Sequence, residues 1–291
     1  MELFRALAAL AEFPGPAQQR LGEMLGLPGT ADPADYTEVF VFQLYPYASV
    51  YAGADGMLGG DARDRAAGFW RALHRVPPAE PDHLAVLLAL YAALAEEEDT
   101  EADRARAALW RQGRTALLRE HLASWLFPYL DKLDEIAPPF YRAWGALLGE
   151  AIAAELRSAA PSVPAPAAGP DALPLHLRQA PPLPDPRDDG GPAFLQGLLS
   201  PVRSGIVLVR ADLARAARDL GLGLRIGERR FVLEALLAQD PDRTLAWVEA
   251  EAQASAARHL RHEPAVGDVA RFWARRAERT AALLDALRVP A

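Results

Sequence analysis

The sequence contains no cysteine among its 291 residues, which excludes disulfides, thiolate metal sites and cysteine nucleophiles. β-Branched residues are sparse and seldom alternate with polar ones, so no substantial sheet is predicted. No uncharged run reaches the ~18 apolar residues of a membrane span. The amino-terminal segment, MELFRALAALAEFPG, lacks the basic region and long apolar core of a signal peptide, so an amphipathic helix is predicted there. These absences favour a protein of the reducing cytoplasm.

Motifs for catalysis and for nucleotide binding are also missing. The glycines between Tyr51 and Asp61 have no Gly-Lys-Ser/Thr ending and no preceding strand, as phosphate-binding and dinucleotide-binding loops require. There is no His-Glu-x-x-His zinc motif and no Gly-x-Ser-x-Gly elbow. His259 and His262 could chelate a metal only weakly. We therefore expect no catalytic residues, no cofactor and no metal; a nucleotide-dependent enzyme is kept as an alternative.

The residues that are abundant favour helices and an acidic surface. Hydrophobic residues make up 51% of the chain and charged residues 24%, a balance that allows a buried core. Alanine, leucine, arginine and glutamate, all strong helix formers, dominate the regular segments. The predicted fold is therefore all-α, a compact multi-helix bundle. The net charge of −8 disfavours nucleic acid and anionic lipid and favours basic peptides as partners.

Proline distribution suggests three regions. Residues 1–160 are predicted as a succession of helices, in which Pro128 ends a long apolar pattern. Residues 161–193 are proline-rich without an apolar face, as in a linker. Residues 194–291 are predicted to be helical again. The helices expected in that last region are 205–220, 228–239, 241–262 and 266–288.

The clearest helix opens at Pro81-Asp82-His83 and carries leucines at helical spacing. One interpretation is a helix start with Asp82 as the cap. The other is a polar pair at the edge of an apolar groove, where Asp82 pairs with a basic peptide, Leu84 and Leu88 line the floor, and His83 responds to pH. The spacing leaves both open.

Three further patterns each have a structural and a functional interpretation. His121 lies one helical turn before Trp125, as a core or half-buried histidine often does. The acidic run Glu96 to Asp103 is typical of a solvated helix end, although it could also attract a basic ligand. Residues 205–230 combine a helix, a glycine-bearing turn and arginines, so a helix-turn-helix DNA-binding regulator is the alternative function.

Several segments together resemble the TorD/DmsD/NarJ family of molybdoenzyme maturation chaperones. The resemblance rests on Tyr-Pro-Tyr-Ala-Ser-Val-Tyr at 45–51 and Pro-Asp-His-Leu at 81–84. His-Leu-Ala-Ser-Trp at 121–125 and Pro-Phe-Tyr at 139–141 support it. It covers residues 35–150. The sequence departs from the family pattern at Leu87, where members often carry an acidic residue, and by the additional residues after 194.

The resemblance implies a non-enzymatic chaperone that binds the apo form of a molybdopterin oxidoreductase subunit. It further implies binding of that subunit's twin-arginine leader peptide, which delays export until the cofactor is inserted. We expect a monomer or a homodimer; neither the individual client nor the role of residues 194–291 follows from the sequence. The expected client-binding residues are Asp82, His83, Leu84, Tyr47, Tyr51, Leu87 and Trp125.

Overall fold

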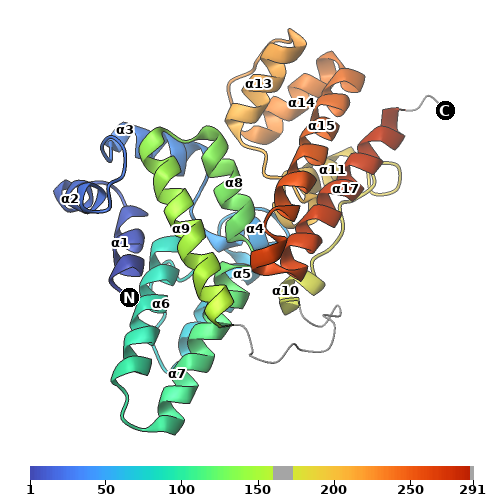
Figure 1. Ribbon diagram of the computed structural model, residues 1–291. Coiled ribbons are helices and arrows are strands. Elements are labelled where there is room, and N and C mark those ends of the chain that lie inside the picture. Colours follow the sequence, from blue (N-terminus) through green and yellow to red (C-terminus); the bar gives the residue numbers. More distant parts are fainter. Residues whose placement is uncertain (160–172, 289–291) are drawn as a thin grey trace. The chain divides into compact units, whose positions relative to one another are not determined.

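The computed structural model describes residues 1–159 and 173–288 and divides the chain into two compact units (Figure 1). The first unit comprises Met1–Ser49 and Leu58–Gly169, and the second comprises Val50–Met57 and Pro170–Ala291. The prediction of an all-α fold is confirmed: the described residues form helices and no strand. None of these helices combines the length and apolar content needed to cross a bilayer.

The first unit is a helical bundle whose centre is α6 (Leu84–Thr100). Leucines and alanines are buried on every side of this helix, which explains why it shows almost no amphipathic face. It packs against α1 and α7, its neighbours in Figure 1. The other helices of this part of the chain are α1 (Glu2–Leu10), α2 (Pro16–Met24), α3 (Pro33–Tyr36), α4 (Ala48–Ala52, which spans the boundary between the units), α5 (Gly60–Ala72), α7 (Arg104–Ala116), α8 (Leu126–Ile136) and α9 (Pro139–Ser158).

Two π-helical segments interrupt the regular helices of the first unit. The segment η1 (Thr37–Gln43) continues α3, and η2 (Leu117–Leu122) continues α7. The segment η1 ends two residues before Tyr45–Tyr47, and η2 ends three residues before Trp125, both in motifs singled out in the sequence. Such wider turns often lie near functional sites.

The predicted end at Pro128 is wrong. The chain breaks earlier, after η2, and restarts as α8 at Leu126. Pro128 then lies in the first turn of α8, where a backbone N–H would have no partner within the helix. A proline inside an apolar pattern therefore marks a helix start here, not a helix end.

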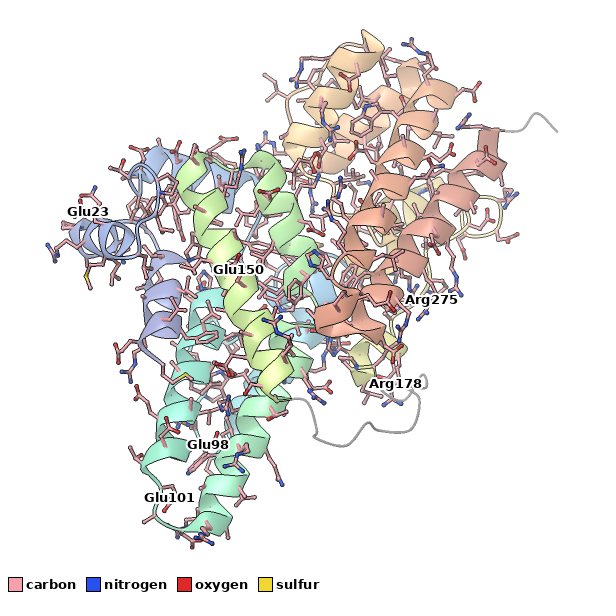
Figure 2. All side chains as sticks on the ribbon, viewed as in Figure 1. Glu23, Glu98, Glu101, Glu150, Arg178 and Arg275 are labelled. Atoms are coloured by element: carbon pink, nitrogen blue, oxygen red, sulfur yellow. The ribbon has the colours of Figure 1, made fainter. Side chains whose placement is uncertain are left out.

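The acidic run at the end of α6 is used inside the bundle. Glu98, labelled in Figure 2, accepts from Arg111 Nε at 2.6 Å and from Arg114 Nε at 2.9 Å. Arg114 also donates to Glu155 Oε2 at 3.1 Å and to the Tyr91 hydroxyl at 2.8 Å, which joins α6, α7 and α9. Glu96 and Glu97 pair with arginines as well. The first three glutamates of the run, Glu96 to Glu98, are therefore compensated by arginines of the same unit.

The second unit is built around the long antiparallel pair α15 (Pro241–Leu260) and α17 (Asp268–Arg288), which lie side by side in Figure 1. The predicted helices at 241–262 and 266–288 are confirmed with ends displaced by a few residues. The remaining helices of this unit are α10 (Leu175–Arg178), α11 (Gly191–Leu198), α12 (Pro201–Ser204), α13 (Arg210–Leu220), α14 (Arg229–Gln239) and α16 (Glu263–Val266).

The tight turn after α12 brings the chain against both long helices. Gly205 has φ +74° and its carbonyl oxygen lies 2.8 Å from His259 Nε2 on α15. Thr280 on α17 donates to the Ser204 carbonyl at 2.7 Å. His259 is therefore buried in the packing of this unit, which removes it from a chelating pair with His262 at the surface.

A segment from the first part of the sequence completes the second unit. Ser200 donates to the Ala54 carbonyl at 2.9 Å, and Gln196 donates to the Asp55 carbonyl at 2.7 Å. Gly56 approaches so closely that an added Cβ would lie 2.8 Å from Ser200 Cα. Gly56 thus serves close backbone packing, whereas a Cβ added at Gly59 or Gly60 would meet nothing within 4 Å.

The predicted linker differs from the structure over its described part. Residues 161–172 lie outside the described residues, but the chain from 173 onward already contains α10, with Leu177 fully buried, and α11 begins at Gly191. Pro-rich composition alone does not reveal these short helices, because each has too few residues to show a period.

The helix-turn-helix alternative finds little support in the observed hairpin. Helix α13 ends at Leu220 and α14 begins at Arg229, so residues 221–228 separate them. The DNA-binding motif joins its helices by a turn of about three or four residues. The first predicted helix is also shorter than 205–220, because residues 205–209 are not helical.

The two glycines at αL positions in the second unit give a matched stability test. In Gly205→Ala the new Cβ would lie 2.2 Å from the Ala277 backbone nitrogen, whereas in Gly221→Ala (φ +67°) it meets nothing within 4 Å. We expect Gly205→Ala to lower the free energy of unfolding by about 3 kcal/mol or more, through strain and overpacking together. Gly221→Ala should lower it by about 1–2 kcal/mol, through strain alone. Urea unfolding of the full chain measures both; equal losses would contradict this packing.

Candidate client-binding site

The Tyr-Pro-Tyr and Pro-Asp-His motifs, far apart in the sequence, are joined by backbone hydrogen bonds. Tyr47 and His83 form an isolated antiparallel bridge. The Ala48 N–H donates to the Asp82 carbonyl at 3.0 Å, and the Leu84 N–H donates to the Pro46 carbonyl at 2.8 Å. We call residues 45–49 and 80–84 the junction. It fixes where α4 and α6 begin.

Asp82 holds the junction from inside. Asp82 is only 2% exposed, and its Oδ2 accepts a hydrogen bond from the Ser49 N–H at 3.1 Å. The Ser49 hydroxyl oxygen accepts in turn from the Gly59 N–H at 3.2 Å. Asp82 therefore satisfies a buried donor in the first turn of α4, a role in which its carboxylate is out of reach of solvent.

The cap of α6 is His83, so the expectation that Asp82 caps this helix is wrong. His83 Nδ1 accepts from the Ala85 N–H at 3.2 Å, and its ring packs edge-on against Tyr47 with centroids 4.7 Å apart. Burial lowers the pKa of His83, against the opposing effect of Glu80, Glu12 and Asp82. The ring is consequently neutral at pH 7, as a cap that accepts a hydrogen bond must be.

Two exposed acids, Glu12 and Glu80, and the half-buried Tyr47 act on the half-buried His83. The Tyr47 hydroxyl donates to Glu80 Oε2 at 2.8 Å, and burial together with that bond raises the pKa of Tyr47. The charges of Glu12 and Glu80 both act on His83, which places the end of α1 near the junction. Phe13, which follows Glu12 in the sequence, is exposed and contacts Tyr36. We call Glu12, Phe13, Tyr47, Glu80 and His83 the rim.

Tyr36 connects the two halves of the rim. Its ring contacts Phe13 edge-on at 5.4 Å, and its hydroxyl donates to the Ala11 carbonyl at 3.3 Å. Burial and then the charges of Glu12 and Glu80 raise its pKa. Since both carboxylates raise the pKa of Tyr36, both lie near its ring. Neither Glu12 nor Glu80 forms an ion pair among the described residues, so this surface keeps its negative charge.

The other expected site residues lie in the interior. Leu84, Leu87 and Trp125 are fully buried, and Trp125 Nε1 donates to the His121 carbonyl at 2.7 Å. Tyr51 is buried too and belongs to the segment that completes the second unit. A peptide cannot touch these side chains, or Asp82, in the observed conformation. Of the expected residues, only Tyr47 and His83 are partly accessible, and a direct role for the others stays a prediction that requires the helices to move.

Sequence reasoning missed Glu12, Phe13 and Glu80. Glu80 directly precedes the Pro-Asp-His motif, so its position was a usable signal. Glu12 and Phe13 follow the first helix, and nothing in the sequence pattern links that helix end to a motif about 70 residues away; only the packing of α1 on α6 does so.

His121 has the structural environment that its spacing predicts. It is half-buried, and its ring packs on Phe69 with centroids 4.8 Å apart. Burial, reinforced by the nearby Arg65 charge, lowers its pKa to about 4. This histidine is neutral in the folded protein across the physiological range.

The segment that contains the junction, the centre of the bundle and η2 matches a known family. Residues 19–130 match the family described as nitrate reductase delta subunit. The match covers 112 of the 291 residues, so this segment is similar to the nitrate reductase delta subunit (NarJ) family. The predicted relationship to the TorD/DmsD/NarJ chaperones is thereby confirmed. Searches of curated proteins and of solved structures returned no match.

The NarJ family consists of molybdoenzyme maturation chaperones, which are non-catalytic. Members of this family bind a molybdoenzyme subunit. The match ends inside α8, so α9 and nearly all of the second unit lie beyond it.

Substitutions at Asp82 separate a structural carboxylate from a client-binding one. Asp82→Ala leaves the buried Ser49 N–H without a partner, and we expect the free energy of unfolding to fall by about 1–3 kcal/mol. Asp82→Asn keeps an acceptor oxygen and should lose less. Thermal and urea unfolding measure the loss. Unchanged stability in Asp82→Ala would contradict the structural role.

The lowered pKa of His121 predicts a loss of stability in acid. Because the unfolded chain takes up a proton near pH 6.5 and the folded chain only near pH 4, this contribution is complete above pH 7 and is lost as pH falls between these values. We expect about 2 kcal/mol less stability at pH 5 than at pH 7 from this group. Urea unfolding of His121→Gln should show a shallower pH dependence than the parent; parallel profiles would contradict the shift.

Proposed function

We propose that this protein is a cytoplasmic chaperone whose rim binds the amino-terminal leader of an apo-molybdoenzyme subunit. In this proposal the leader is of the twin-arginine type, and its binding holds the subunit back from export while the molybdopterin cofactor is inserted. The match to the NarJ family supports the class of client, and the chemistry of the rim supports the leader as the bound segment.

The observation that carries the proposal is the pair of exposed carboxylates, Glu12 and Glu80, together with the half-buried ring of Tyr47 and the exposed ring of Phe13. A guanidinium group donates charge-assisted hydrogen bonds to carboxylates and stacks on the faces of tyrosine and phenylalanine. Tyr47 and Phe13 offer such faces next to the two acids. A neutral His83 adds no positive charge that would repel a basic ligand.

The hydrogen bonds of the junction hold Tyr47 in place, so binding would cost little conformational entropy. Tyr47 is held by the bridge to His83 and by its bond to Glu80, so its ring is oriented before a ligand arrives. The net charge of −8 over the chain increases the encounter rate with basic segments. An affinity near 1 µM, about −8 kcal/mol, is expected for a short leader.

Calorimetric titration with a twin-arginine leader peptide tests the rim. We expect Glu12→Gln with Glu80→Gln to weaken binding about tenfold, since two charge-assisted contacts become neutral ones. Tyr47→Phe keeps the ring and should weaken binding less than Tyr47→Ala. Raising the salt concentration should weaken the parent more than the double variant.

Matched controls are available on other helices of the same unit. Glu23 on α2 and Glu150 on α9 are exposed acids away from the rim residues in sequence, and both are labelled in Figure 2. Glu23→Gln with Glu150→Gln removes the same total charge and should leave affinity within about twofold. Equal losses in the two double variants would mean that net charge, not the rim, governs binding, and the proposed site would be abandoned.

A further inference from the structure

The loop between α13 and α14 exposes large apolar side chains. Ile226 is 97% exposed, Leu224 51% and Phe231, in the first turn of α14, 59%. We call these three residues the apolar tip. Large apolar side chains grouped at one exposed loop are unusual on a protein surface in contact with water. They commonly mark a contact with a partner or a membrane.

Hydrogen bonds fasten the base of this loop. The Gly223 N–H donates to Gln239 Oε1 at 2.8 Å, and Gln239 Nε2 donates to the Gly223 carbonyl at 2.9 Å. Gly221 ends α13 in the αL conformation with φ +67°, which turns the chain away from the helix. The loop is therefore tied at its start, and Leu224 and Ile226, which follow this attachment in the sequence, are exposed.

The charge around the apolar tip is opposite to that of the whole chain. Residues 210–230 contain six arginines against Asp212, Asp219 and Glu228, a net charge of +3 in a chain of −8. Arg218 and Arg225 are both exposed, and no ion pair is recorded for either among the described residues. Since charges are screened beyond about 8 Å at physiological salt, the local arginines dominate what a surface at the tip would meet.

We propose that the apolar tip docks this protein onto the surface of an anionic lipid bilayer. Ile226 and Leu224 would enter the boundary between headgroups and acyl chains, while Arg218 and Arg225 pair with anionic headgroups. Interfacial segments combine these features, apolar side chains flanked by arginine or lysine. The local excess of arginine beside these apolar side chains favours an anionic lipid surface as the occupant, because its charge is complementary to theirs. The docking is independent of leader binding at the rim.

Sedimentation of the full chain with vesicles tests the proposal. Phosphatidylcholine vesicles containing phosphatidylglycerol should bind the parent, and binding should fall as salt rises. Leu224→Ser with Ile226→Ser should lower the partition coefficient at least about tenfold. Arg218→Glu with Arg225→Glu should lower it by a similar factor on anionic vesicles. All four residues are exposed, so folding should be retained, which circular dichroism verifies.

A control pair removes exposed apolar groups elsewhere. Met24 is 81% exposed and Val76 89% exposed, so Met24→Ser with Val76→Ser changes similar side chains in the first unit and should leave vesicle binding unchanged. No binding of the parent to anionic vesicles would overturn the proposal, as would equal losses in the control. A photo-crosslinker at position 226 that yields dimers without lipid, and no lipid adduct with vesicles, would assign the tip to a second copy of the chain instead.

Discussion

The arrangement of the candidate site depends on the hydrogen bonds that join residues 45–49 to residues 80–84. A backbone bridge aligns the two segments, and the buried Asp82 carboxylate satisfies the Ser49 N–H where water cannot enter. These bonds set the start of α6 at the centre of the first unit and orient Tyr47 against His83. The positions of Tyr47 and His83 at the surface therefore depend on the buried carboxylate of Asp82. Asp82, which the sequence suggests as a ligand-binding residue, is buried and supports the surface residues from beneath.

Residues 194–291 are structurally linked to the first part of the sequence. The segment Val50–Met57, which directly follows the junction in the sequence, packs with α11 and α12 through backbone carbonyls that Gln196 and Ser200 satisfy. Removal of the carboxy-terminal region would leave those carbonyls and the close approach at Gly56 without partners. We therefore expect Val50–Met57 and the carboxy-terminal helices to fold together as one structural element.

The sequence predicted the helical class and most long helices, because leucine periodicity and helix-forming residues act locally. It also located the junction motifs. It could not show that Asp82, Leu84, Leu87 and Trp125 are buried, because the same residue types line grooves and cores. The start of α8 was missed because Pro128 is compatible with a first turn. Glu12 and Phe13 reach the rim only through the packing of α1 on α6, which no local pattern encodes.

Photo-crosslinking from a leader peptide tests the central claim most directly. With the photoreactive group beside the twin arginines, the account predicts adducts at Glu12–Phe13, Tyr47 and Glu80–His83 of the full chain. Adducts at Leu84, Leu87 or Trp125 would instead show that the helices part to form an apolar groove. Adducts confined to other surfaces would contradict the rim as the client-binding site.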